Sequence, residues 1–141
     1  MRVCAGVERA QVVDVAALAE ALSRSGDEGL TLGAAYYRDL SAHYRARRDT
    51  LFASLDRAGF KPQRPDGAYY ILCDISGFGA KDDVTFARRL VAEVGVAAVP
   101  GSSFFSRPEL GRDLIRFTFC KTDDLLREAG ERLMRARDML A

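Results

Sequence analysis

The residue most suited to chemistry is Arg116, which stands in the middle of the segment DLIRFTFCK, residues 113–121. Apolar residues alternate through this segment, a pattern typical of a β-strand. Alternation divides it into two faces: Leu114, Arg116, Thr118 and Cys120 on one, and Ile115, Phe117 and Phe119 on the other. We expect the phenylalanine face to be the core. Burying an unpaired charge is costly, so the guanidinium either reaches water or holds an anion, and its planar fork suits a carboxylate.

Other reactive side chains lack the neighbours that catalysis requires. His43, the single histidine, falls on a predicted helix surface and has no partner at the spacing of a triad or a metal site. The cysteines are far apart and form no CxxC pair, so no zinc site is predicted; they are Cys4, Cys73 and Cys120. Capping explains the carboxylates at predicted helix starts, which are Asp82, Asp83, Asp123 and Asp124.

Two loops have compositions that could suit a ligand. GFGAK, residues 77–81, matches neither GxGxxG nor GxxxxGK[ST], so we interpret it as a flexible turn. PGSSFF, residues 100–105, either offers backbone donors and aromatic walls to a ligand or is a turn with ordinary packing residues. Both interpretations of the second loop stay open at this point.

The composition indicates a soluble globular domain without a strongly charged partner. The chain has 141 residues, of which 48% are hydrophobic and 29% charged, and its formal net charge is +1. This balance gives no drive toward nucleic acid or an acidic membrane. Acidic residues interrupt the apolar N-terminal stretch, so neither a signal peptide nor a membrane span is predicted. The isolated cysteines favour a reducing cytoplasm.

Hydrophobic periodicity predicts the elements that position Arg116. Helices are expected at about residues 8–24, 34–58 and 83–94, and from Thr122 or Asp123 to the end; strands are expected at 68–75, 96–100 and 113–121. Asp82 or Asp83 caps the third helix, and Gly59 and Gly95 end the second and third.

Each of the last three predicted helices has an apolar face. The expected inner residues are Tyr37, Leu40, Tyr44, Leu51 and Leu55 in the first of them; Val84, Ala87, Leu90, Val91 and Val94 in the next; and Leu125, Ala129, Leu133, Ala136 and Leu140 in the last.

This order of elements predicts an α/β fold, a small mixed β-sheet with helices packed on one face, preceded by a long helix. Residues 34–141 form the expected small domain. Residues 1–33 are expected to be a helical segment left over from a larger domain and its connection.

Three segments of the sequence resemble a known protein family. They are YRARRDTLFASLDRAGFKPQRPDGAYYILCDI, FARRLVAEVGVAAVPGSSFF and LIRFTFCK. In order and spacing they resemble the C-terminal part of fold-type I, pyridoxal-phosphate-dependent aminotransferases, of the class I/II branch with aspartate, aromatic and kynurenine enzymes. The resemblance implies the small-domain fold and amino-group transfer from an amino acid to a 2-oxo acid. It also implies pyridoxal 5'-phosphate as cofactor and a homodimer in the intact enzyme.

The resemblance also implies site residues. The arginine of the last block binds the substrate's α-carboxylate in this family, which assigns that role to Arg116. The VPGSSFF loop lies near the substrate entrance, so Ser103 and Phe104 are expected to line it. The PDGAYY turn lies close to the substrate pocket and adds Gly67 and Tyr69.

One departure from the family is large. Its Schiff-base lysine stands in a motif like SxxK upstream of every block found here, and Lys61, Lys81 and Lys121 lack that context. We therefore expect a catalytically incomplete fragment, inactive alone because cofactor chemistry needs that lysine. Two alternatives stay open: a stand-alone small-molecule-binding or interaction module derived from that domain, which would bind amino acids or 2-oxo acids, and a chain that assembles with a separately encoded large domain.

Overall fold

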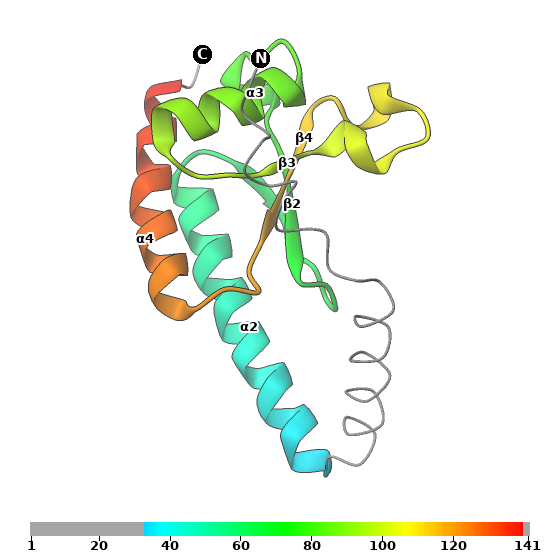
Figure 1. Cartoon of the computed structure of the whole chain (residues 1–141), viewed down its shortest axis with the longest axis vertical. Coiled ribbons are helices and arrows are strands. Elements are labelled where there is room, and N and C mark those ends of the chain that lie inside the picture. Colours follow the sequence, from blue (N-terminus) through cyan, green and yellow to red (C-terminus); the bar gives the residue numbers. More distant parts are fainter. Residues whose placement is uncertain (1–32, 140–141) are drawn as a thin grey trace, which may run out of the picture. The chain divides into compact units, whose positions relative to one another are not determined.

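The computed structural model describes residues 33–139 and divides the chain into two compact units, Met1–Leu40 and Ser41–Ala141. The predicted helix 8–24 and Leu140 lie outside the described residues. The elements, in chain order, are α2 (Ala34–Arg57), β1 (Lys61–Gln63), β2 (Tyr70–Asp74), α3 (Asp83–Arg89), β3 (Val99–Pro100), β4 (Leu114–Thr118) and α4 (Asp123–Leu133) (Figure 1). Within residues 33–139, none of the helices is long and apolar enough to cross a membrane.

The strands form one sheet in the order β1-β2-β4-β3, and each pairing is antiparallel. The fold class is confirmed, but the expected mixture of parallel and antiparallel pairings is wrong for the described strands. The reason is the position of β4. The chain passes through α3 between β2 and β3, and these two strands run parallel to each other. They do not pair directly, because β4 lies between them and is antiparallel to both.

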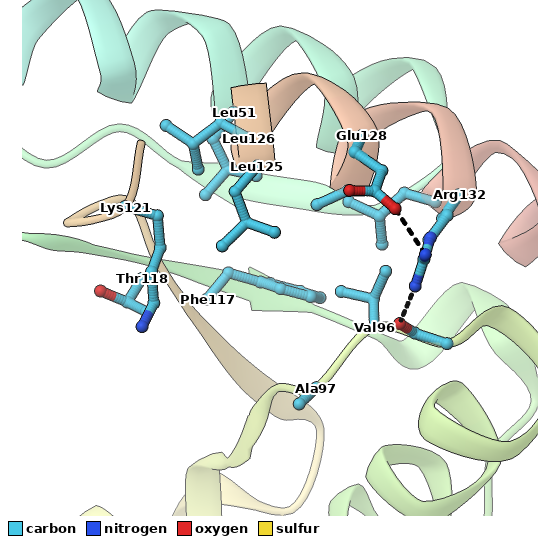
Figure 2. A pocket seen from close by; sticks show the side chains of 13 residues that line it. Leu51, Val96, Ala97, Phe117, Thr118, Lys121, Leu125, Leu126, Glu128 and Arg132 are labelled. Carbon is cyan, nitrogen blue, oxygen red and sulfur yellow. Dashed lines mark hydrogen bonds and ion pairs between the residues drawn. The ribbon is translucent and has the colours of Figure 1, made fainter. Parts of the chain in front are cut away.

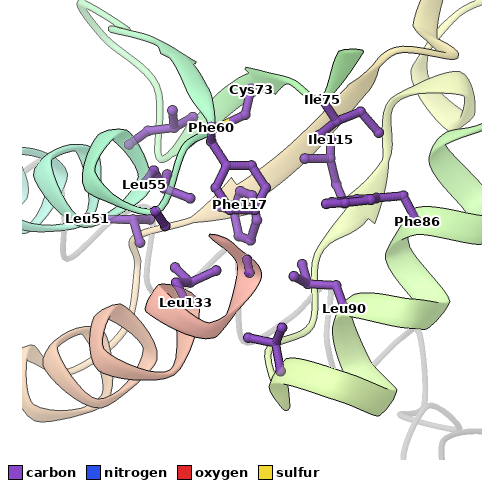
Figure 3. Packing of buried hydrophobic residues seen from close by; sticks show 14 of the residues in the cluster. Leu51, Leu55, Phe60, Cys73, Ile75, Phe86, Leu90, Ile115, Phe117 and Leu133 are labelled. Atoms are coloured by element: carbon purple, nitrogen blue, oxygen red, sulfur yellow. The ribbon is translucent and has the colours of Figure 1, made fainter. Parts of the chain in front are cut away.

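The core lies on one face of this sheet, as alternation predicted. Ile115, Phe117 and Phe119 are buried, while Arg116 between them is half-buried. Side chains from the helices cover the same face (Figure 3), and they are Leu51 and Leu55 of α2, Phe86 of α3, Leu90 of the following π-helical turn, and Leu133 of α4. Burying several large side chains together stabilises the unit 41–141.

The predicted inner face of α3 and the turn after it is confirmed for Ala87, Leu90 and Val94, which are buried, and wrong for the two other predicted residues. Val84 and Val91 are exposed, whereas Phe86 is fully buried. The cause is Asp83, which is itself buried because its carboxylate accepts a hydrogen bond from the Ser102 N–H. Because Asp83 faces inward, residues three, four, seven and eleven positions later lie on the same face of the helix and are buried. They are Phe86, Ala87, Leu90 and Val94.

The inner face of α4 also differs in part from the prediction. Leu125 is exposed and Ala129 half-buried, while Leu126, Gly130 and Leu133 are buried. Gly130 faces Ser54 of α2 so closely that a Cβ added there would lie 2.5 Å from the Ser54 hydroxyl. A glycine at this contact allows the two helices to approach and fixes the rotation of α4. The predicted positions Leu133 and Ala136 are buried as expected.

The apolar stripe predicted on α2 is confirmed for its C-terminal half. Leu51 and Leu55 are buried, and the half-buried Tyr44 packs its ring 6.1 Å from that of Phe119. Tyr37 and Leu40, which belong to the first unit, are exposed. The helix ends at Arg57, and two residues later Gly59, with a φ of 94°, has the left-handed conformation expected of a glycine cap.

The two cysteines of the second unit should differ sharply in reactivity. Cys73 is fully buried on β2, and burial raises the pKa of its thiol, whereas Cys120 is exposed. Because the thiolate is the reactive form, we expect iodoacetamide to modify Cys120 in the folded chain and to leave Cys73 unmodified until denaturant is added. Peptide mapping by mass spectrometry measures both; equal labelling of Cys73 and Cys120 without denaturant would contradict the fold.

Candidate functional site

Arg116 lies at the centre of the sheet, on the face opposite the core. Leu72 of β2 is its cross-strand neighbour on one side and Val99 of β3 on the other. Two aromatic rings contact its guanidinium: the central carbon lies 4.9 Å from the ring centroid of Tyr70 and 3.9 Å from that of Phe104. These distances are typical of cation–π contacts, which attract the charge without using its N–H donors.

No residue between positions 33 and 139 accepts a hydrogen bond from the N–H groups of Arg116. Among residues 33–139 the side chain makes no hydrogen bond and no ion pair, whereas Arg47, Arg89 and Arg132 each pair with a carboxylate. The described chain also contains no buried side-chain nitrogen that lacks a hydrogen-bond partner. Half-buried Arg116 therefore has no hydrogen-bonding or ion-pairing partner for its guanidinium within the described part of the chain. A positive charge in an apolar surround, with free donors at the surface, suits an incoming carboxylate.

Phe104 reaches Arg116 from a loop that is fixed at two points. The 3₁₀ turn Gly101–Phe104 follows β3 directly, and its Ser102 N–H donates to Asp83 Oδ2 over 2.6 Å. Asp83 is 1% exposed, so this charge-assisted hydrogen bond forms away from water. Gly101 also packs against Gly111, where an added Cβ would lie 2.5 Å from the Gly101 carbonyl carbon.

The residues predicted for the site are only partly brought together. Phe104 contacts Arg116 directly, and Tyr69 stacks edge-on against Tyr70 with ring centroids 5.4 Å apart. Ser103 is exposed in the same turn as Phe104, and Gly67 is exposed with no atom within 4 Å of its Cβ position. A substrate role for Ser103, Gly67 and Tyr69 stays a prediction.

Two residues of this arrangement were not predicted from the sequence. Tyr70 was overlooked in favour of Tyr69, although the apolar Ile71 and Cys73 of the same strand already place position 70 on the outer face. Asp83 was interpreted as a possible cap. Asp82 is the cap instead, and its hydrogen bond from the Thr85 N–H lowers the pKa of the Asp82 carboxyl.

A pocket of about 180 Å³ lies elsewhere in the second unit, between α4 and β4 (Figure 2). Its walls are mostly apolar and include Phe117, Leu126 and Leu133, while Arg116, Tyr70 and Phe104 are not among its lining residues. Arg132, at one end of the pocket, donates hydrogen bonds to the Glu128 carboxylate and to the Gly95 carbonyl oxygen. This pocket therefore lacks the aromatic-framed guanidinium that distinguishes the Arg116 face.

The described residues do not fit pyridoxal phosphate. A Schiff-base lysine needs a shielded site in which its amine can lose its proton. Lys61, Lys81 and Lys121 are all exposed. The Lys61 Nζ group donates a hydrogen bond to the Ser76 hydroxyl oxygen over 3.4 Å. Lys121 borders the apolar pocket, but that pocket offers no cluster of unpaired donors for a phosphate.

Comparisons with known proteins agree with one another. The family described as Aminotransferase class I and II matches residues 10–133. A kynurenine–oxoglutarate transaminase of Dictyostelium discoideum is 34% identical over 120 residues, covering 72% of this chain and 28% of that protein. A probable N-succinyldiaminopimelate aminotransferase of Mycobacterium tuberculosis is 40% identical over 97 residues, or 63% of this chain and 24% of its own. The chain thus spans about a quarter of the length of the curated relatives it matches.

Solved structures show the same fold. N-succinyldiaminopimelate aminotransferase from Mycobacterium tuberculosis matches with a TM-score of 0.68 at 40% identity, covering 73% of this chain and 27% of that one. Aspartate aminotransferase from Thermus thermophilus, in a structure with maleate, matches with a TM-score of 0.62 at 37% identity, covering 72% and 25%.

Proposed function

This chain belongs to the class I and II aminotransferases, and we propose that it is the C-terminal part of a pyridoxal-phosphate-dependent amino-acid aminotransferase. In this proposal its role is to bind the α-carboxylate of the amino acid or 2-oxo acid through Arg116. The observation that carries the proposal is the guanidinium itself: half-buried, contacted by two aromatic rings, and without a hydrogen-bonding partner among residues 33–139.

The relatives support a carboxylate as the shared feature of the ligands. Their names refer to kynurenine, N-succinyldiaminopimelate, methionine, and aspartate or prephenate. The side chains of these substrates differ, whereas a carboxylate is common to them, and the Thermus relative was solved with maleate, a dicarboxylate. Arg116 fits the common group, because a guanidinium binds a carboxylate through two parallel N–H donors.

The proposal assigns cofactor binding to a part of the protein other than the described residues. Family membership implies pyridoxal phosphate, and the three lysines of the chain are all exposed. We therefore propose that this chain alone does not transfer amino groups. We also propose that the intact enzyme is a homodimer, as the resemblance implies, and that it works in a reducing cytoplasm, in keeping with the free thiols of Cys73 and Cys120.

Adding pyridoxal phosphate to the purified chain tests the assignment of the cofactor. After borohydride reduction and peptide mapping, we expect at most low modification spread over Lys61, Lys81 and Lys121, because all three lysines are exposed and so lack the shielded site that a Schiff-base lysine needs. Complete modification of one lysine, together with the absorbance band of a stable imine lost on its replacement by arginine, would refute the proposal that the Schiff-base lysine lies elsewhere.

A further inference from the structure

We propose that Tyr70 and Phe104 act as an aromatic clamp, which positions the guanidinium of Arg116 for a carboxylate, and that Asp83 holds the loop that carries Phe104. This inference rests on the proposed function and deepens it. Tyr70, Phe104 and Asp83 are positioning residues here, because each acts on the ligand through Arg116.

Arg116 is held by ring contacts rather than by a carboxylate among the described residues. Arginine has a long side chain with much rotamer freedom, and ordering it on binding would weaken affinity. A carboxylate side chain that held the guanidinium in place would compete with the ligand for the same N–H donors. Tyr70 and Phe104 contact the guanidinium through their ring faces instead. The clamp therefore limits the motion of the group and leaves its donors free.

Phe104 is unusually exposed for a residue in a well-fixed turn. Its side chain is 47% exposed, although it is large and apolar. The turn around it is nevertheless well fixed, by the Asp83–Ser102 hydrogen bond and by the contact of Gly101 with Gly111. A loop that is fixed so closely and still presents a half-exposed ring is more consistent with a binding role than with packing alone.

Asp83 connects α3 to the loop that carries Phe104. This carboxylate is buried at the start of α3 and accepts a hydrogen bond from the backbone two residues before Phe104. Removing the charge weakens that bond and loosens the turn, so the ring should move away from Arg116. Asp82 provides a matched control, because it is the neighbouring acidic residue and caps the same helix. Its carboxylate accepts a hydrogen bond from the Thr85 N–H and not from the loop.

Two readouts on the full chain separate the clamp from the proposed function. The first readout is the NMR chemical shifts of the Arg116 Nε–H and side-chain protons in the absence of ligand. The ring currents of Tyr70 and Phe104 should change these shifts. The second is the dissociation constant for pyruvate, a simple 2-oxo acid, followed by the same signals. We compare Phe104→Leu, Phe104→Tyr, Asp83→Asn and Asp82→Asn, each checked for folding by its backbone amide spectrum.

We expect Phe104→Leu to remove much of the ring-current displacement and to weaken pyruvate binding roughly fivefold. Phe104→Tyr should retain both properties, Asp83→Asn should reduce both by a smaller factor, and Asp82→Asn should change neither. Unchanged pyruvate affinity in folded Phe104→Leu would overturn the positioning role. Normal ring-current shifts in the wild type without any pyruvate binding would instead refute the proposed function and leave the contact between rings and arginine intact.

Discussion

Replacing Arg116 with lysine is expected to weaken the binding of a 2-oxo acid roughly 30-fold or more, which corresponds to about 2 kcal/mol. Lysine keeps the positive charge but loses the planar pair of N–H donors that a carboxylate engages in parallel. It also loses the flat surface that Tyr70 and Phe104 contact. Arg116→Ala should abolish measurable binding. Titration with pyruvate, followed by the amide spectrum of the chain, gives each dissociation constant.

The matched control for this prediction is Arg112→Lys. Arg112 lies four positions before Arg116, is exposed, and is outside the aromatic contacts. Its replacement should leave pyruvate affinity unchanged within about twofold, because exposed charges contribute little to a contact they do not make. An equal loss in both variants would mean that net charge, rather than the geometry of Arg116, determines binding.

Gly111→Ala is expected to destabilise the second unit by roughly 1–3 kcal/mol. The added Cβ would lie 2.5 Å from both the Gly101 carbonyl carbon and the Ser102 nitrogen, which are backbone atoms and cannot rotate away. The turn Gly101–Phe104 must then shift as a whole, so the Asp83–Ser102 hydrogen bond should weaken as well. Urea unfolding measures the loss of stability, and the pyruvate titration measures the displacement of Phe104.

Gly77→Ala serves as the control for the backbone effect of the same substitution. Gly77 has no atom within 4 Å of its Cβ position and its φ is not positive, so alanine fits there without strain. Its stability should be unchanged or slightly higher. If Gly111→Ala unfolds at the same urea concentration as Gly77→Ala, the close packing of the two glycine segments is wrong.

The sequence predicted the faces of β4 because a strand has a period of two and apolar residues alternate without a break from Ile115 to Phe119. This regularity was sufficient to single out Arg116. The short strand β1 was missed, since Pro62 in a run of three residues is a weak indication of a strand. The position of β4 between β2 and β3 was also missed, because pairing order depends on contacts between distant segments.

The rotation of α3 and α4 could not be derived from periodicity alone. Both helices offer apolar residues on more than one side, Val84 or Phe86 in one helix and Leu125 or Leu126 in the other. Distant contacts determine which of them faces inward: Asp83 with the Ser102 N–H, and Gly130 with Ser54. The clamp around Arg116 is likewise a product of folding, because it joins Tyr70, Phe104 and Arg116 from three separate segments.

The most direct test of the central claim is a titration of the isotopically labelled chain with pyruvate and, in parallel, with pyruvamide, its uncharged amide. The proposal that Arg116 binds the substrate carboxylate predicts saturable shifts at Arg116, Tyr70 and Phe104 with pyruvate and none with pyruvamide. Equal shifts with both compounds, no shifts with pyruvate, or shifts confined to the pocket beside Lys121 and Leu125 would contradict it.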